Sequence, residues 1–232
     1  MIQYSQFCPV SKTAEVLGEK WTLLVVRELV LGATRFSKIQ RAIPRISPTM
    51  LNKRLSELQT HGVIVRKRIP EQQGYEYQLT ESGRELYPLI LQMAQWGMRW
   101  TRSTMSDEDL DVEVLMSDIQ RRIDPSRLPG GQTILRFRYT DLDKFSDWWI
   151  KINQGKAELC LEDPGDQVDV YFTTTLRTMT EVWMGDLPFK KAQAEGRLKV
   201  VGPPTPLRSL RSWFPLYLYA HLRPQVRDGE NG

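Results

Sequence analysis

Residues 47–62 of this chain form a segment with helix signals at both ends. Ser47 can accept a backbone N–H as an N-cap, and Pro48 suits the first helical position. Gly62 is a typical residue at which a helix ends. A shorter helical segment opens at residues 34–39, so the sequence predicts two helices joined by a tight turn.

The two faces of the 47–62 helix differ in chemistry. Leu51, Leu55 and Leu58 recur at helical spacing on one side, whereas the opposite side is small, polar and basic. Such an outer face suits insertion into the major groove of DNA, whereas a core helix would have a larger apolar outer face. The predicted DNA-contacting residues are Ser47, Pro48, Thr49, Asn52, Lys53 and Ser56, together with Arg35 from the shorter helix.

A β-hairpin is predicted directly after this helix. Residues 63–69 and 75–79 are rich in β-formers, and residues 70–74 join them with turn chemistry. A basic triplet is more often a solvated surface, but its place after a candidate recognition helix favours contact with the phosphate backbone. The hairpin is therefore interpreted as a wing, with DNA contacts from Arg66, Lys67 and Arg68.

A long helix is predicted from Thr80 to about Thr101, with a kink at Pro88. Its apolar residues recur at three- and four-residue steps, as in a coiled-coil seam. They could pack against their own domain, but two tryptophans near the far end favour burial against a second subunit. The predicted dimerisation residues are Leu86, Leu89, Ile90, Met93, Trp96 and Trp100.

Length and charge indicate two domains with different partners. The 232 residues are ample for two cores, expected at residues 1–104 and 113–222. Residues 1–104 carry 15 Lys and Arg against 8 Asp and Glu (net +7), and the remaining 128 residues carry 17 against 20 (net −3). A polyanionic partner is therefore expected for the first domain only.

Several classes of protein are not expected from the composition. No apolar run approaches the roughly 18 residues of a membrane span, and the N-terminus lacks signal-peptide features, so a cytoplasmic protein without membrane contact is expected. Two cysteines and two histidines, widely separated, predict neither a disulfide framework nor a metal site. Catalytic and cofactor motifs such as GxGxxG, GxxxxGK and HExxH are absent, so neither an enzyme nor a cofactor is expected.

The second domain combines strands and helices. Helices are predicted at residues 114–123, 176–184, 188–194 and 207–213, the last after a proline-rich turn. Strands are predicted at residues 133–139, 145–152, 157–161, 168–174 and 198–201. The pattern predicts an α+β domain with an antiparallel sheet and helices to one side, after a mainly α winged helix-turn-helix domain with a β-hairpin wing.

A set of motifs in the first hundred residues occurs in a characteristic order. They are Cys8-Pro9-Val10, Gly18-Glu19-Lys20-Trp21, Arg27-Glu28-Leu29, Arg35-Phe36, Ile46-Ser47-Pro48, Arg54-Leu55, Glu57-Leu58, Tyr77-Gln78-Leu79-Thr80 and Gly83-Arg84-Glu85-Leu86. With these motifs, residues 7 to about 100 resemble the HxlR family of bacterial regulators, which are relatives of the MarR winged-helix proteins. The resemblance implies a homodimer on a pseudo-palindromic double-stranded DNA operator, with recognition helices in major grooves about 34 Å apart.

Two positions are interpreted through this resemblance. The wing tip, Glu71-Gln72-Gln73-Gly74, lacks the proline and basic residue common in the family, so DNA contacts are assigned to residues 66–68 rather than to the tip. Cys8 matches a cysteine that is a thiol sensor in several members, and Lys12 one turn on could lower its pKa. The alternative is a buried cysteine acting as a small hydrophobe, and the matched position alone does not decide between them.

The second domain is similar to the sterol carrier protein fold. The similarity rests on Asp169-Val170-Tyr171-Phe172-Thr173-Thr174, on Trp183-Met184-Gly185-Asp186-Leu187 and on Leu198-Lys199-Val200-Val201-Gly202. It implies an apolar tunnel that binds a small apolar effector such as a lipid or acyl chain, although aromatic residues are more often core. The candidate lining residues are Phe145, Trp148, Trp149, Tyr171, Trp183 and Trp213.

The expected function is a sequence-specific DNA-binding transcriptional regulator, controlled by an effector that shifts the spacing of its recognition helices. The alternative is a lipid or acyl-chain carrier that uses the winged helix mainly for dimerisation. A carrier would show no operator preference and would keep its ligand when Lys53 is changed.

Overall fold

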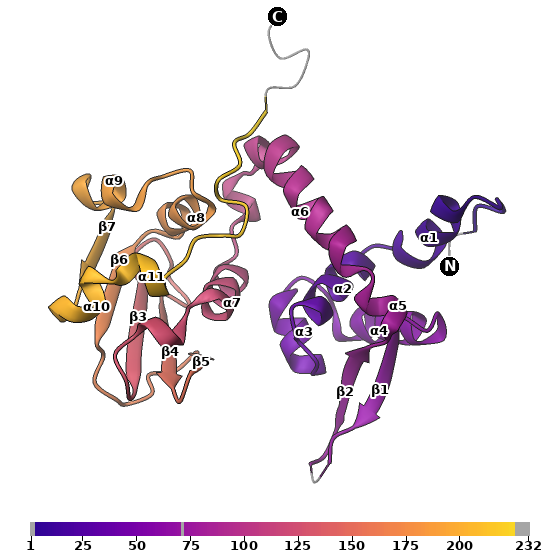
Figure 1. Ribbon diagram of the computed structural model, residues 1–232, viewed down its shortest axis with the longest axis horizontal. Coiled ribbons are helices and arrows are strands. Elements are labelled where there is room, and N and C mark those ends of the chain that lie inside the picture. Colours follow the sequence, from indigo (N-terminus) through magenta and orange to yellow (C-terminus); the bar gives the residue numbers. More distant parts are fainter. Residues whose placement is uncertain (1–2, 71, 226–232) are drawn as a thin grey trace, which may run out of the picture. The chain divides into compact units, whose positions relative to one another are not determined.

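The computed structural model describes residues 3–70 and 72–225, and the chain divides into two compact units, Met1–Trp96 and Gly97–Gly232 (Figure 1). The boundary falls within helix α6 (Tyr87–Trp100), whereas the sequence predicted it after this helix, at residues 105–112. The last turn of α6 belongs to the second unit, where the Arg99 carbonyl accepts the Gln225 N–H at 2.8 Å.

The first unit contains the two helices and the hairpin predicted between residues 34 and 79, with further helices before and after them. In chain order they are α1 (Pro9–Leu17), α2 (Thr22–Val30), α3 (Phe36–Ala42), α4 (Pro48–Thr60), β1 (Ile64–Arg68), β2 (Tyr75–Leu79), α5 (Glu81–Arg84) and α6. The apolar faces meet in one core that includes Val25, Val26, Leu29, Ile39, Leu51, Leu55, Leu58 and Ile64.

Helix α4 begins and ends at the predicted residues. The Ser47 hydroxyl accepts the Met50 backbone N–H at 3.2 Å, and Pro48 occupies the first helical position. At the other end Gly62 has a φ of +69°, a backbone conformation that other residues rarely adopt. The length of α4 is therefore encoded locally.

The hairpin is extended by a short segment that the sequence did not reveal. β1 and β2 pair antiparallel, with Arg66 opposite Tyr77. On the other edge of β2, the Tyr77 N–H donates to the Thr34 carbonyl at 2.7 Å, and Arg35 forms an isolated bridge with Glu76. The segment before α3 is thus tied to the wing.

The prediction of one continuous helix from Thr80 is wrong. Helices α5 and α6 are separated at residues 85–86. Pro88 explains the break, because it has no N–H to donate to the Arg84 carbonyl and disfavours helical backbone in the residue before it. Thr80 does act as the N-cap of α5, where its hydroxyl accepts the Gly83 N–H at 3.2 Å.

The second unit contains α7 (Val112–Arg122), β3 (Thr133–Tyr139), β4 (Asp147–Asn153), β5 (Lys156–Cys160), β6 (Val170–Thr174), α8 (Leu176–Met184), α9 (Phe189–Ala194), β7 (Leu198–Val201), α10 (Pro204–Arg208) and α11 (Leu210–Trp213). Short 3-10 turns lie at Arg102–Thr104, Asp107–Asp109 and Pro125–Arg127. The expected proline-rich turn is partly helical, since Pro204 begins α10.

The sheet of this unit is mixed, which corrects the prediction of an antiparallel sheet. Its strand order is β5-β4-β3-β6-β7, and β6 pairs with β3 in parallel, with Leu135 opposite Val170. A parallel pair needs a long connection, which β4, β5 and residues 161–169 provide. The other strand pairs are antiparallel.

Alternate residues of the central strands form the core of this unit. Phe137 of β3 stacks on Phe172 of β6, with ring centroids 4.5 Å apart, and Phe214 stacks on Phe172 at 5.4 Å. Helices α7, α8, α9 and α11 all contribute side chains to this one core. The opposite face of the sheet carries Arg136 and Tyr171, which lie side by side in the register.

Candidate nucleic-acid interface

The outer face of α4 is exposed over its whole length. Its inner face is held by Leu51, Leu55 and Leu58, each at most 1% exposed. Because these three leucines anchor the helix, the polar side points to solvent. The structure exposes all six candidate residues of this segment: Ser47, Pro48, Thr49, Asn52, Lys53 and Ser56.

A buried arginine on the inner side of α4 was not among the predicted functional residues. The side chain of Arg54 is 4% exposed, and its Nη1 donates to the Glu57 carboxylate. Its Nη2 lies 3.3 Å from a carboxylate oxygen of Glu19, which lies between α1 and α2. The spacing of Arg54 from Leu51 and Leu58 places it in the apolar stripe, a signal that could have revealed its burial.

A groove of about 440 Å³ separates the outer side of α4 from the hairpin. Polar side chains line it from α4 (Asn52, Ser56, Gln59 and Thr60) and from the hairpin (Arg66 and Tyr77). The guanidinium of Arg66 stacks 3.6 Å from the centroid of the Tyr75 ring, which limits its freedom. Gln59 and Thr60 were not predicted as site residues, since only the hairpin's position brings them into this groove.

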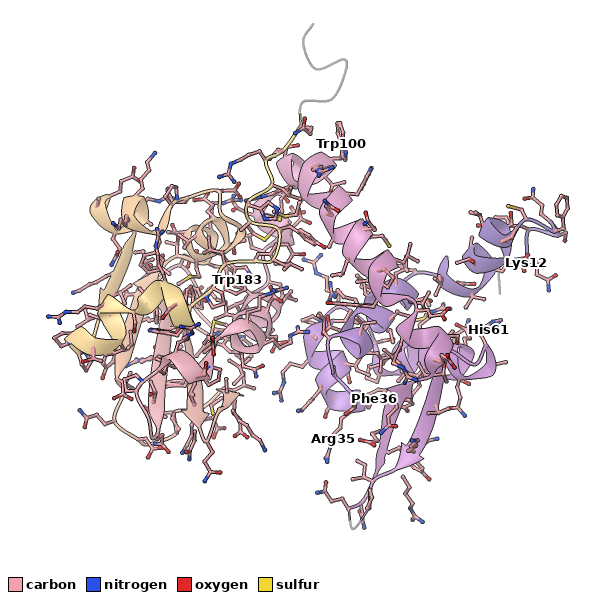
Figure 2. The ribbon with its side chains drawn as sticks, viewed as in Figure 1. Lys12, Arg35, Phe36, His61, Trp100 and Trp183 are labelled. Atoms are coloured by element: carbon pink, nitrogen blue, oxygen red, sulfur yellow. The ribbon has the colours of Figure 1, made fainter. Side chains whose placement is uncertain are left out.

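The basic triplet of the wing is exposed but divided between two faces. Successive strand residues point to opposite sides, so Arg66 and Arg68 leave one face of β1 and Lys67 the other. The Arg35 side chain extends toward the hairpin, where its Nη2 donates to the Gln72 side-chain oxygen at 2.6 Å (Figure 2). Arg35 is therefore exposed to solvent and also bonded to the hairpin. Glu71, at the wing tip, lies outside the described residues.

The predicted dimerisation seam separates into two groups. Leu86 and Ile90 pack against the core of the first unit. Leu89, Met93 and Trp96 are exposed, Trp96 by 59%. Trp100 is partly buried. The exposed group is a candidate contact surface, whereas Leu86 and Ile90 stabilise their own domain.

Cys8 occupies the N-cap position of α1 and is only partly buried, so it is not a core residue. The backbone N–H groups of Ser11 and Val10 at the start of the helix lower the pKa of its thiol. Lys12 was expected to do this, but its ammonium pairs with Glu15 at 2.9 Å. This partly exposed position at a helix start does not fit a small buried hydrophobe.

The six aromatic candidates of the second unit do not surround one pocket. Phe145 lies outside β4, has a φ of +56° and is 60% exposed. Tyr171 points to the face of the sheet opposite the core and is also exposed. Neither can line an enclosed tunnel with the others.

The tryptophans fill the core instead. Trp148 and Trp213 have no accessible surface and Trp183 has 2%. A side chain that lines a cavity large enough for water would retain accessible area, so these three do not border an open tunnel. Trp149 follows Trp148 along β4 and points to the opposite face, where the Arg136 guanidinium lies 5.6 Å from its ring centroid.

No group of three or more His, Cys, Asp or Glu side chains in residues 3–70 and 72–225 is placed to hold a metal ion. Within the same ranges, no helix combines the length and apolar character required to cross a bilayer.

The helices α3 and α4, the polar outer face of α4 and the basic hairpin define a winged helix-turn-helix protein, a class whose second helix enters the major groove. Residues 16–105 match the family described as HxlR-like helix-turn-helix. With the relatives described next, this match shows that the chain belongs to the HxlR-like helix-turn-helix family.

Two relatives from Bacillus subtilis (strain 168) are named uncharacterized HTH-type transcriptional regulators. YvaP is 36% identical over 105 residues, which cover 44% of this chain and 97% of YvaP. YdeP is 40% identical over 96 residues, which cover 40% of this chain and 73% of YdeP. Among solved structures, the reduced form of the transcriptional regulator YodB from B. subtilis is 33% identical and covers 42% of this chain and 98% of YodB, with a TM-score of 0.37. None of these names is that of an enzyme.

Proposed function

We propose that this chain is a sequence-specific transcriptional regulator that binds a pseudo-palindromic DNA operator as a homodimer. In this arrangement α4 of each subunit enters one of two successive major grooves, about 34 Å apart. The residues that contact DNA are those on the outer face of α4, together with the basic residues of the wing.

The observation that carries the proposal is the exposed outer face of α4. Asn52 and Lys53 are both exposed. Asparagine and lysine side chains can form hydrogen bonds with base edges or phosphates. No large apolar residue lies between them and solvent, so a DNA groove can approach the helix closely. The net charge of +7 over residues 1–104 supports a polyanionic partner.

The dimer is proposed from the exposed apolar residues of α6. Leu89, Met93 and Trp96 follow one another at steps of three and four residues, so they lie on one helix face. Large apolar side chains at such spacing gain free energy when a second copy covers them. A two-fold dimer would present two copies of α4, as a pseudo-palindromic site requires.

The first test is a fluorescence-anisotropy titration of the full chain against DNA from upstream of its own gene. A scrambled DNA of equal length is the control, and both are measured at about 50 and 200 mM salt. We expect tight binding to the upstream DNA and weak, salt-sensitive binding to the scrambled DNA. Equal affinity for both would contradict sequence-specific recognition of this DNA.

Variants separate the proposed interface from general charge. We expect Lys53→Ala to weaken operator binding about tenfold or more. Lys190→Ala removes an exposed lysine of α9 in the second unit and should leave binding unchanged. Arg66→Ala should mainly reduce the salt dependence, by about 0.9 in the log–log slope for one phosphate contact. Equal losses in Lys53→Ala and Lys190→Ala would refute the assignment of α4.

The lipid-carrier alternative is not favoured. The relatives are named regulators, and Trp148 and Trp213 have no accessible surface through which an apolar ligand could be reached. An apolar effector of the second domain stays a prediction, because it requires this core to open.

A further inference from the structure

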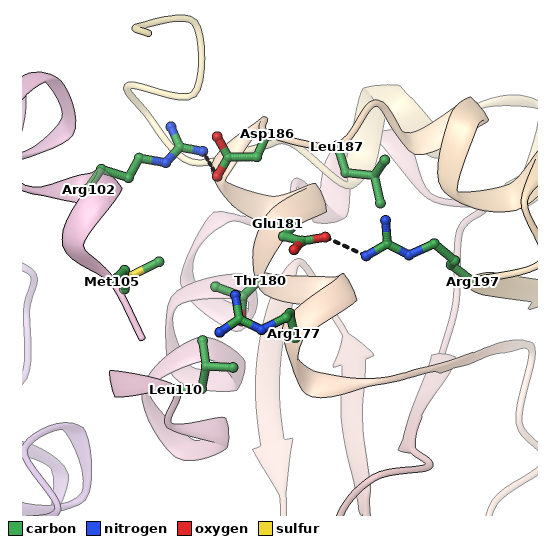
Figure 3. Close-up of a pocket in the computed structure, with 9 residues that line it drawn as sticks. All are labelled: Arg102, Met105, Leu110, Arg177, Thr180, Glu181, Asp186, Leu187 and Arg197. Atoms are coloured by element: carbon green, nitrogen blue, oxygen red, sulfur yellow. Dashed lines mark hydrogen bonds and ion pairs between the residues drawn. The ribbon is translucent and has the colours of Figure 1, made fainter. Parts of the chain in front are cut away.

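The second unit carries a polar cleft of about 340 Å³ that the sequence did not reveal (Figure 3). Its volume is at the lower end of small-molecule sites. Arginine, carboxylate and apolar side chains line it.

Three arginines reach this cleft from separate elements. Arg102 lies in the turn after α6, Arg177 in the first turn of α8, and Arg197 directly before β7. Two carboxylates also line the cleft, those of Glu181 and Asp186. The lining therefore brings three guanidinium groups together with two carboxylates, and Asp107 and Glu195 pair with Arg177 and Arg197 from outside it.

The ion pairs of the outer two arginines are accessible to solvent. Arg197 pairs with Glu181 at 2.5 Å, and Arg177 pairs with the exposed carboxylate of Asp107, which lies outside the cleft lining. Exposed pairs of this kind contribute little free energy. An anionic ligand can therefore replace or join these carboxylates at small cost.

Arg102 is different, because its guanidinium is buried and only partly satisfied. Its side chain is 4% exposed, and its Nη2 donates to the Met184 carbonyl at 2.9 Å and pairs with Asp186. Its Nε and Nη1 have no hydrogen-bond partner among the described residues. Buried guanidinium N–H groups without acceptors are costly, so this end of the cleft is short of acceptor atoms.

From this shortage of acceptors and the convergence of three arginines, we infer that the cleft binds a small organic anion, with its carboxylate or phosphate group toward the arginines. Arg177 and Arg197 hold the oxyanion by charge-assisted hydrogen bonds. When the half-exposed Asp186 turns outward, the oxyanion also supplies hydrogen-bond acceptors to the guanidinium of Arg102. Met105, Leu110 and Leu187 provide an apolar wall for a short hydrocarbon part.

The cleft is suited to controlling the regulator, and this step rests on the proposed function. Arg102 comes two residues after the end of α6, the helix that carries the exposed Leu89, Met93 and Trp96. A ligand that orders the Arg102 turn therefore acts on the end of the helix proposed for dimerisation. Differential affinity of the anion for two dimer arrangements would then change operator affinity.

Isothermal titration calorimetry of the full chain, without DNA, tests the binding site. The probes are hexanoate, succinate and inorganic phosphate, with neutral hexanamide as the match for hexanoate. We expect saturable binding of one anion per chain and much weaker binding of hexanamide. The comparison of the two carboxylates with phosphate identifies which oxyanion the cleft accepts.

Two variants test the location of the site. Arg177→Gln and Arg197→Gln remove partly exposed charges and spare the buried Arg102, and each should weaken anion binding about tenfold. Arg211→Gln, an exposed arginine of α11, should leave it unchanged. Equal binding of hexanoate and hexanamide, equal effects of all three variants, or no saturable binding up to about 10 mM anion would overturn the proposal.

Operator binding is then measured with and without the anion that binds. A change in DNA affinity that Arg197→Gln abolishes supports the regulatory step. Anion binding without such a change contradicts the regulatory step alone. Because calorimetry uses no DNA, failure of the anion site and failure of operator recognition are distinguishable.

Discussion

Replacement of Arg54 by methionine removes the buried guanidinium on the inner side of α4 and keeps most of its apolar volume. The change breaks the contacts of Arg54 with Glu57 and Glu19. Lys53→Met on the same helix is the matched control, because Lys53 is exposed. The two variants change neighbouring residues by the same net charge.

The size of the effect follows from burial. Breaking a fully buried ion pair costs about 3–5 kcal/mol, because the charge left behind has no partner. Here the carboxylates of Glu19 and Glu57 are each 24% exposed, so water partly replaces the lost contact. Among the residues that the structure describes, the buried Nε of Arg54 has no hydrogen-bond partner, which also lowers the cost of its removal. We therefore expect Arg54→Met to reduce the free energy of unfolding of the first unit by about 2–3 kcal/mol.

Urea unfolding followed by hydrogen exchange of peptides measures the unfolding midpoint of each unit separately. With a denaturant slope of about 2 kcal/mol per molar, the midpoint for peptides from α4 should fall by about 1 M or more. Peptides from β6 and α8 of the second unit are the internal reference and should not shift. A shift for Arg54→Met no larger than that for Lys53→Met would refute the structural role of Arg54.

Three further predictions concern other parts of the chain. A Cβ at Gly83 would lie 2.2 Å from a backbone carbonyl oxygen. Gly83→Ala should therefore reduce the free energy of unfolding of the first unit by about 1–3 kcal/mol, measured by urea unfolding. Near neutral pH, iodoacetamide should alkylate Cys8 faster than Cys160, because helix amides lower the pKa of the first thiol and burial raises the pKa of the second. This difference should shrink as the pH rises above both pKa values. Trp96→Ser should shift the chain from dimer to monomer in sedimentation velocity.

Each of these predictions has its own control. For Gly83→Ala the control is Gly97→Ala, because a Cβ at Gly97 would make only an ordinary contact at 3.5 Å. This control should change the free energy of unfolding little. Phe145→Ser removes an equally exposed aromatic from the second unit and should leave the oligomeric state unchanged. Equal alkylation rates of the two thiols would show that the N-cap position does not activate Cys8.

The elements of the fold could be predicted wherever their signals are local. Each of these signals depends only on residues nearby in the sequence: the N-cap at Ser47, the helix end at Gly62 and the alternating residues of the hairpin. The exposed face of α4 follows from the same periodicity, so the candidate DNA-contacting residues could be named before the structure. The break before Pro88 was also a local signal, although a kink was expected there instead.

Other features depend on residues far apart in the chain. The parallel pairing of β6 with β3 was not predicted, because strand order depends on how the whole sheet assembles. Aromatic side chains are as common in a packed core as around an apolar ligand, so the sequence cannot distinguish these two roles. The absence of accessible surface at Trp148 and Trp213 assigns them to the core.

Local sequence signals were enough to predict α4 with its limits, the two strands of the hairpin and the polar outer face of the recognition helix. Two long-range features required the folded structure: the pairing of Arg54 with a carboxylate 35 residues away, and the cleft that Arg102, Arg177 and Arg197 share. The physical reason is the range of the interactions involved. Caps and helical periodicity act within one or two turns, whereas burial and the clustering of charges depend on segments that meet only when the chain has folded.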